Sequence, residues 1–132
     1  TAGGACILAG KPEGEGPMTG VVTRLAEEFM MGPEDLADIF TTYFLETAQM
    51  IRDCRSALVS GDVPALVRLG HSIKGSSANL RLEQVFRCAL ELEDAARGGN
   101  LTVIAPSLDR LADEVAIAET EVSNFYRKVK TT

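Results

Sequence analysis

The stretch of greatest chemical interest is GHSIKGSSANL, residues 70–80, which contains the only histidine of the 132-residue chain. Lys74 follows His71 by three residues, a spacing that brings two side chains within reach of each other on a helix. An imidazole that is neutral near pH 7 offers a nucleophilic nitrogen, and a neighbouring ammonium offers positive charge to an anion. This pair suits the acceptance of a phosphoryl group, because phosphoryl transfer depends mainly on positioning and on nearby positive charge.

A helical wheel places His71 almost opposite the apolar side of its helix, which includes Leu66, Leu69 and Ile73. The sequence therefore predicts an exposed ring, and an ordinary solvated surface histidine is the alternative that this placement leaves open. Gly75, one turn later, costs about 1 kcal/mol relative to alanine in an exposed helix. We expect it to leave room for a ligand or partner, although a merely tolerated glycine explains that residue alone equally well.

Positive charge is concentrated around the histidine in an otherwise acidic chain. The net charge is −6 with a pI near 4.8, which argues against nucleic acid or an anionic membrane as the main partner. Between Val63 and Leu82 there is no Asp or Glu, whereas Arg68, Lys74 and Arg81 are present. Chance could produce such a run, but together with His71 and Gly75 it favours an anion site. The residues expected to flank this site and meet a partner are Arg68, Ala78 and Arg81.

Other chemistries lack the residues that they need. Cys6, Cys54 and Cys88 are widely spaced, and with no CxxC pair and no second histidine we expect reduced thiols and no metal site. The KGSS stretch does not have the order of a phosphate-binding Walker loop, and no triad can be placed around His71. Because no long apolar run and no signal-like start is visible, we expect a cytoplasmic protein without membrane insertion.

The pattern along the chain predicts a tail followed by one helical domain. Residues 1–20 hold six of the twelve glycines and indicate a flexible Gly/Pro-rich tail or linker, and residues 21–130 form the domain. Apolar spacings of three and four predict helices over 21–31, 33–59, 63–79 and 82–97 and from about Pro106 onward. Short connections favour antiparallel neighbours. The predicted fold is therefore all-α: an antiparallel four-helix bundle with the short first helix lying across one end.

The stretch LGHSIKGSSANL resembles the signature of histidine-containing phosphotransfer (HPt) domains, which is roughly His-x-Leu/Ile-Lys-Gly-Ser/Ala-Ser/Ala followed by an apolar residue. The matching residues are His71, Ile73, Lys74, Gly75, Ser76, Ser77 and Leu80. The flanking stretches SGDVPALVRL and CALELEDAARGGN are also similar to the family, and the resemblance extends over about residues 34–128.

This resemblance implies that His71 accepts a phosphoryl group from the aspartyl phosphate of a receiver domain and passes it to another receiver aspartate. By position, Lys74 would neutralise the group and Gly75 would leave room for the receiver, while Ser76 and Ser77 pack toward the core. The protein would be a phosphoryl carrier without turnover or cofactor of its own, and magnesium would belong to the receiver. Its partners would be response-regulator receiver domains and a histidine kinase, separate, hybrid or in the same polypeptide. We expect a monomer.

Two positions differ from the common family pattern. Arg81 stands where a glycine usually helps the turn into the next helix, so we expect Asn79 to take the left-handed conformation and Arg81 to extend the positive surface. Gly70 stands where alanine is frequent, which we interpret as a minor change.

Three other functions compete with the relay. In the kinase-attached variant of the family, an ATP-binding domain phosphorylates the histidine and a neighbouring glutamate orients the ring; Glu46 and Glu93 are candidates that the sequence does not place. A helical interaction module that transfers nothing would keep partner binding without His71. An enzyme with its own turnover would need a second catalytic group, which the sequence does not reveal.

Overall fold

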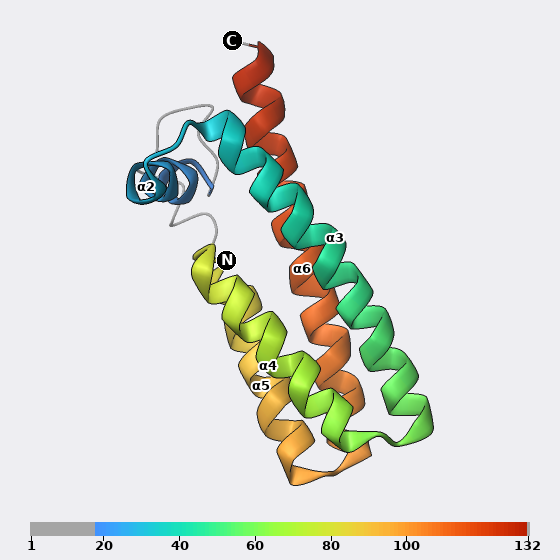
Figure 1. Cartoon of the computed structure of the whole chain (residues 1–132). Helices are drawn as coiled ribbons and strands as arrows, with labels where there is room; N and C mark the ends of the chain where they lie inside the picture. Colours follow the sequence, from blue (N-terminus) through green and yellow to red (C-terminus); the bar gives the residue numbers. More distant parts are fainter. Residues whose placement is uncertain (1–17, 132) are drawn as a thin grey trace, which may run out of the picture.

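The computed structural model describes residues 18–131, with side chains as far as residue 128. This part of the chain forms helices and no strand. The helices, labelled as in Figure 1, are α2 (Thr19–Phe29), α3 (Pro33–Ser60), α4 (Val63–Asn79), α5 (Glu83–Gly98) and α6 (Leu101–Thr131). Within this described range, no helix has both the length and the apolar character needed to cross a lipid bilayer.

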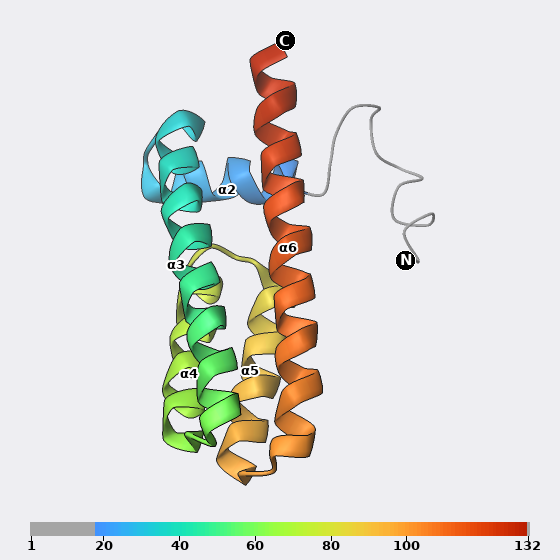
Figure 2. The same ribbon diagram turned by 90° about the vertical axis from the view of Figure 1, so that its right-hand side faces the viewer.

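The four long helices, α3 to α6, run alternately up and down beside one another (Figures 1 and 2). Helix α4 packs on α3 and α5, and α6 completes the bundle by packing on α5 and α3. The short α2 lies crosswise at one end of the bundle, where it packs on α3 (Figure 2). The predicted all-α four-helix bundle with an additional short N-terminal helix is therefore confirmed.

Apolar stripes on the helices meet in one continuous core. The predicted stripe of α3 is buried at Leu36, Phe40, Tyr43, Thr47 and Cys54, and Met50 and Leu58 pack against the core from its edge. Helix α6 buries Ile104, Leu108, Leu111, Val115, Ala118 and Val122. Because burial of each large apolar side chain contributes about 1.5–3 kcal/mol, this core makes the bundle a firm support for the exposed face of α4.

The start of the last helix differs from the prediction. Helix α6 begins at Leu101, so the predicted start near Pro106 is wrong and the proline lies inside the helix. The backbone carbonyl of Asn100 accepts a hydrogen bond from the N–H of Ile104 at 3.0 Å, and its side-chain oxygen accepts one from Thr102 at 3.0 Å. Ile104 is fully buried, and its packing together with this cap outweighs the backbone hydrogen bond that Pro106 cannot make.

The corner between α4 and α5 also differs from the prediction. Arg81, and not Asn79, takes the left-handed conformation, with φ of 57°. The N–H of Leu82 bonds to the carbonyl of Ser77 at 3.0 Å and the N–H of Arg81 to that of Ala78 at 3.1 Å, which is the Schellman arrangement. Leu80 and Leu82 are both buried, so the residue between the two leucines must turn the chain after α4 ends at Asn79.

The remaining boundaries agree with the predicted ranges to within two residues. Residues 1–17 of the predicted tail lie outside the described residues, whereas Thr19 and Gly20 already belong to the first turn of α2.

Two substitutions at Arg81 separate backbone strain from side-chain pairing. Both Arg81→Gly and Arg81→Ala lose the ion pair with Glu28 (2.9 Å), which at the surface contributes about 0–1 kcal/mol. Only glycine adopts the positive φ without strain, so we expect Arg81→Gly to be more stable than Arg81→Ala by about 1 kcal/mol. Urea unfolding of the two variants measures this difference, and equal stabilities would contradict the left-handed corner.

Candidate functional site

His71 projects from the middle of α4 into solvent. The helix begins at Val63, and Asp62 caps it by accepting a hydrogen bond from the N–H of Ala65 at 3.1 Å. The imidazole side chain is 66% exposed, in agreement with the helical wheel, while Leu66 and Ile73 on the opposite side are fully buried. The ring is therefore carried by a helix that is fixed in the core but is itself open to a partner.

A buried carboxylate lies beside the exposed ring. Glu93, on α5, is only 3% exposed, and its Oε2 lies 3.1 Å from Nδ1 of His71. Of the two glutamates considered from the sequence, Glu93 is therefore the neighbour of the ring. Glu46 is exposed on α3 and lines a groove on another side of α4.

Two cations also pair with Glu93. Nζ of Lys74 lies 2.7 Å from Oε1, and Nη2 of Arg97 lies 2.8 Å from Oε2. Lys74, predicted as the cation of the site, is thus brought next to His71 but is engaged by the carboxylate. Arg97 was missed by the sequence analysis, although its spacing of four residues from Glu93 on one helix was a signal that could have found it.

These contacts determine the ionisation of Glu93. The ammonium of Lys74, 2.7 Å from Oε1, and then the hydrogen bond from Arg97 lower the pKa of Glu93 from 4.5 to about 2; burial opposes this shift, and His71 adds to it. Glu93 is therefore a carboxylate at neutral pH and can only accept hydrogen bonds. It follows that Nδ1 of His71 carries the ring proton and that this N–H donates a hydrogen bond to Glu93, which leaves the lone pair of a neutral ring on Nε2. Within the described side chains, Nε2 has no hydrogen-bond partner.

Gly70 determines how closely α5 approaches α4. A Cβ atom added at Gly70 would lie 3.2 Å from the backbone nitrogen of Glu93 and 3.3 Å from its Cα. Even alanine would therefore require the Glu93 backbone to shift by a few tenths of an ångström. Glycine in place of the frequent alanine is therefore more than the minor change predicted, because it lets the Glu93 backbone lie against α4.

The small residues after the histidine have different surroundings. A Cβ at Gly75 would meet nothing within 4 Å, so packing inside the bundle does not require glycine there. Ser77 is fully buried, as predicted, and its Oγ lies 2.6 Å from the hydroxyl of Tyr43 on α3. Ser76, predicted to pack toward the core, is only half-buried and borders a groove.

The predicted flanking residues are not all close to the ring. Arg68 is exposed on α4, and Ala78 is half-buried. Arg81 is turned toward α2, where its guanidinium pairs with Glu28 at 2.9 Å. Glu93 contacts both His71 and Lys74, so these two predicted site residues lie together. Arg81 instead forms a separate ion pair at the end of α4.

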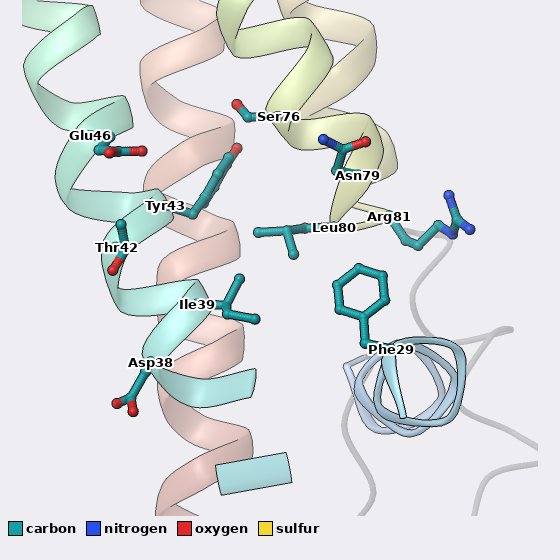
Figure 3. Close-up of a pocket in the computed structure, with 10 residues that line it drawn as sticks. All are labelled: Phe29, Asp38, Ile39, Thr42, Tyr43, Glu46, Ser76, Asn79, Leu80 and Arg81. Atoms are coloured by element: carbon teal, nitrogen blue, oxygen red, sulfur yellow. The ribbon is translucent and has the colours of Figure 1, made fainter. Parts of the chain in front are cut away.

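A groove lies between α2, α3 and the end of α4 (Figure 3). Phe29, Ile39 and Leu80 give it an apolar wall, and Asp38, Glu46 and Arg81 supply charge around it. His71, Lys74 and Glu93 are not among its lining residues. The exposed imidazole is thus on open surface, which suits a macromolecular partner better than a small substrate that must be enclosed.

Among residues 18–131, no cluster of three His, Cys, Asp or Glu side chains could hold a metal ion.

Comparison with known families is consistent with this geometry. The family model of the Hpt domain matches residues 38–121, more than half of the chain. The chain belongs to the Hpt domain family. No curated protein matches it. The matched range of this Hpt domain contains His71, Lys74, Glu93 and Arg97, and α2 lies before it. Hpt domains carry phosphoryl groups in two-component phosphorelays and are not enzymes in the usual sense, so the family indicates phosphotransfer.

The low pKa of Glu93 makes the stability of this Hpt domain dependent on pH. Because the pKa is about 2 in the folded protein and 4.5 ordinarily, the stabilisation from Glu93 is fully present above about pH 4.5 and disappears as the pH falls toward 2. At pH 7 we expect Glu93→Gln to be less stable than the wild type by about 1–3 kcal/mol. This gap should shrink between pH 4.5 and pH 2 in urea unfolding.

A matched control is Glu83→Gln, which removes an exposed carboxylate of the same helix that has one ion pair, with Arg87 at 3.5 Å. Its effect at pH 7 should stay within about 0.5 kcal/mol. A stability gap for Glu93→Gln that does not change with pH would contradict the pairing of Glu93 with Lys74 and Arg97.

Proposed function

We propose that His71 accepts a phosphoryl group from the aspartyl phosphate of one receiver domain and passes it to the aspartate of another. The observation that carries this proposal is the exposed His71 ring, whose Nδ1 lies 3.1 Å from a buried carboxylate. Nε2 is the accepting atom, because it holds the lone pair and lies on the open face of α4. Membership of the Hpt family supports the same reading.

The chemistry balances without an added acid or base. The Nε2 lone pair attacks phosphorus, an N–P bond forms, and the P–O bond to the donor aspartate breaks with its electron pair leaving on the carboxylate. The proton stays on Nδ1, so the phosphorylated ring is an imidazolium that faces the Glu93 carboxylate at 3.1 Å. The carboxylate of Glu93 stabilises the positive charge of the phosphorylated ring. That positive charge is lost when the N–P bond breaks during transfer to the second receiver.

Lys74 and Gly75 serve this transfer in different ways. Lys74 lies one helical turn from the ring, and we propose that it neutralises charge on the phosphoryl oxygens. Gly75 is exposed with no atom near its missing Cβ, so it leaves room for the active site of the receiver. Arg68 and Ala78 would contribute to the contact with the receiver. Arg81 would add positive charge once its ion pair with Glu28 is broken.

In this proposal the domain is a carrier without independent turnover and has no cofactor of its own. Magnesium is supplied by the receiver, where the aspartate reacts. Response-regulator receiver domains and a histidine kinase are the partners, the domain acts as a monomer, and its location is the cytoplasm. The free thiols of Cys54 and Cys88 are compatible with a reducing compartment.

A second candidate is direct phosphorylation of His71 by the ATP-binding domain of a kinase. The observation that favours it is the contact between Glu93 and the ring, because a neighbouring glutamate typically orients the histidine in the kinase-attached variant of the family. The two functions use the same atom of His71 and differ in the donor. A third possibility, an interaction module that transfers nothing, is separated from both by the substitution of His71.

Replacement of His71 by glutamine tests the carrier directly. We expect complete loss of label from phosphorylated receiver domains, while receiver binding changes by less than about threefold, because an exposed ring contributes little to folding. A panel of receivers is charged and mixed with each protein, and the label is resolved on phosphate-affinity gels with acid and alkali challenges.

An acid-labile, alkali-stable label on the wild type alone would support the relay. Label from ATP and a kinase, with none from any receiver, would favour the second candidate. Unchanged signalling by His71→Gln in cells would contradict both forms of transfer and leave the interaction module.

Replacement of Gly75 by alanine should separate stability from transfer. A Cβ there meets no atom within 4 Å, so we expect the variant to be more stable by up to about 1 kcal/mol through helix propensity. If the receiver approaches closely, transfer should fall at least severalfold despite the gain in stability. Urea unfolding and transfer kinetics measure the two effects, and unchanged transfer to Gly75→Leu would remove the proposed role of Gly75.

A further inference from the structure

We propose that Arg97 is a positioning residue whose charge makes Lys74 available to the phosphoryl group. The inference rests on the proposed function, because it concerns how His71 is phosphorylated. Arg97 lies one turn after Glu93 on α5 and contacts the carboxylate rather than the ring. Its effect therefore has to pass through Glu93.

The two oxygens of Glu93 are divided between partners from different helices. Oε1 faces Nζ of Lys74 at 2.7 Å, and Oε2 is shared by Nδ1 of His71 at 3.1 Å and Nη2 of Arg97 at 2.8 Å. Arg97 is anchored on the same helix as Glu93, so this pair can persist while α4 side chains rearrange. Lys74 is on the same helix as His71, three residues later, so it is the cation placed to meet a group on the ring.

The balance of charge shows why the second cation matters. Without Arg97, the ammonium of Lys74 and the carboxylate of Glu93 would neutralise each other, and an incoming phosphoryl group would meet a neutral pair. With Arg97 the cluster contains two cations, Lys74 and Arg97, and one carboxylate, Glu93, which leaves one positive charge in excess. Because Arg97 pairs with Oε2 and Lys74 with Oε1, the carboxylate does not fully neutralise Lys74, and the excess positive charge is available there.

Burial of the carboxylate makes release of Lys74 costly unless Arg97 remains. The side chain of Glu93 is 4% exposed, whereas that of Arg97 is 60% exposed and that of Lys74 is 24% exposed. A buried carboxylate that loses its cation is strongly destabilised, because little water replaces the lost partner. Arg97 holds Oε2 throughout, so Lys74 can turn from Oε1 toward a phosphoryl oxygen on Nε2 without leaving Glu93 unpaired.

The test uses phosphoramidate, a small phosphoryl donor, so that it does not depend on finding a receiver. The labelling rate of His71 is measured by intact-protein mass spectrometry for the wild type, Arg97→Ala, Arg97→Lys, Lys74→Ala and the double variant Lys74→Ala/Arg97→Ala. Arg87→Ala is the matched control, because Arg87 also lies on α5 and pairs with a glutamate four residues earlier, Glu83. Circular dichroism confirms that each variant is helical.

We expect Arg97→Ala to slow labelling by about threefold to tenfold and Arg97→Lys to restore most of the rate. In the Lys74→Ala background, Arg97→Ala should have almost no further effect, because Arg97 acts through Lys74. Arg87→Ala should label at the wild-type rate.

Three results would overturn the inference. If Arg97→Ala labels at the wild-type rate, Arg97 has no part in the reaction, although the proposed function stands. If it causes the same fractional loss with and without Lys74, Arg97 acts on the donor directly and does not position Lys74. If the folded wild type is not labelled at His71 at all, the inference fails together with the proposed function.

Discussion

The buried carboxylate of Glu93 is the constraint on which the geometry of the site depends. A carboxylate withdrawn from water must be held by hydrogen bonds and cations, and here Lys74, Arg97 and His71 supply them. That requirement fixes the ring proton on Nδ1 and directs the lone pair of His71 outward. It also requires α4 and α5 to lie close together, and the close approach is possible because Gly70 has no side chain. One buried charge thus determines the orientation of the exposed ring of His71.

The bundle separates the exposed face of α4 around His71 from the residues that hold it in place. His71 and Gly75 lie on the open face of α4, while Ile73 and Ser77 on its other side are fully buried. The hydroxyl pair between Ser77 and Tyr43 joins α4 to α3 beneath the site. A helix fixed in this manner presents the imidazole without enclosing it, which suits contact with a large partner.

Most of the fold was predictable from sequence because helices follow local periodicity and local caps. The exposed position of His71 followed from the same periodicity. The errors arose where tertiary packing decided: burial of Ile104 starts α6 before Pro106, and burial of Leu80 and Leu82 makes Arg81 the turning residue. The contact of Glu93 with His71 joins two helices, and no spacing rule along one helix can place it.

We propose that Nε2 of His71 carries the phosphoryl group while Nδ1 keeps its proton against Glu93. The most direct measurement is nuclear magnetic resonance of the phosphorylated protein with ¹⁵N-labelled histidine, in which coupling to ³¹P identifies the bonded ring nitrogen. Because the chain has a single histidine, the assignment has no competitor. We expect phosphorus on Nε2 and a hydrogen-bonded proton on Nδ1. Phosphorus on Nδ1, or on a residue other than His71, would contradict it.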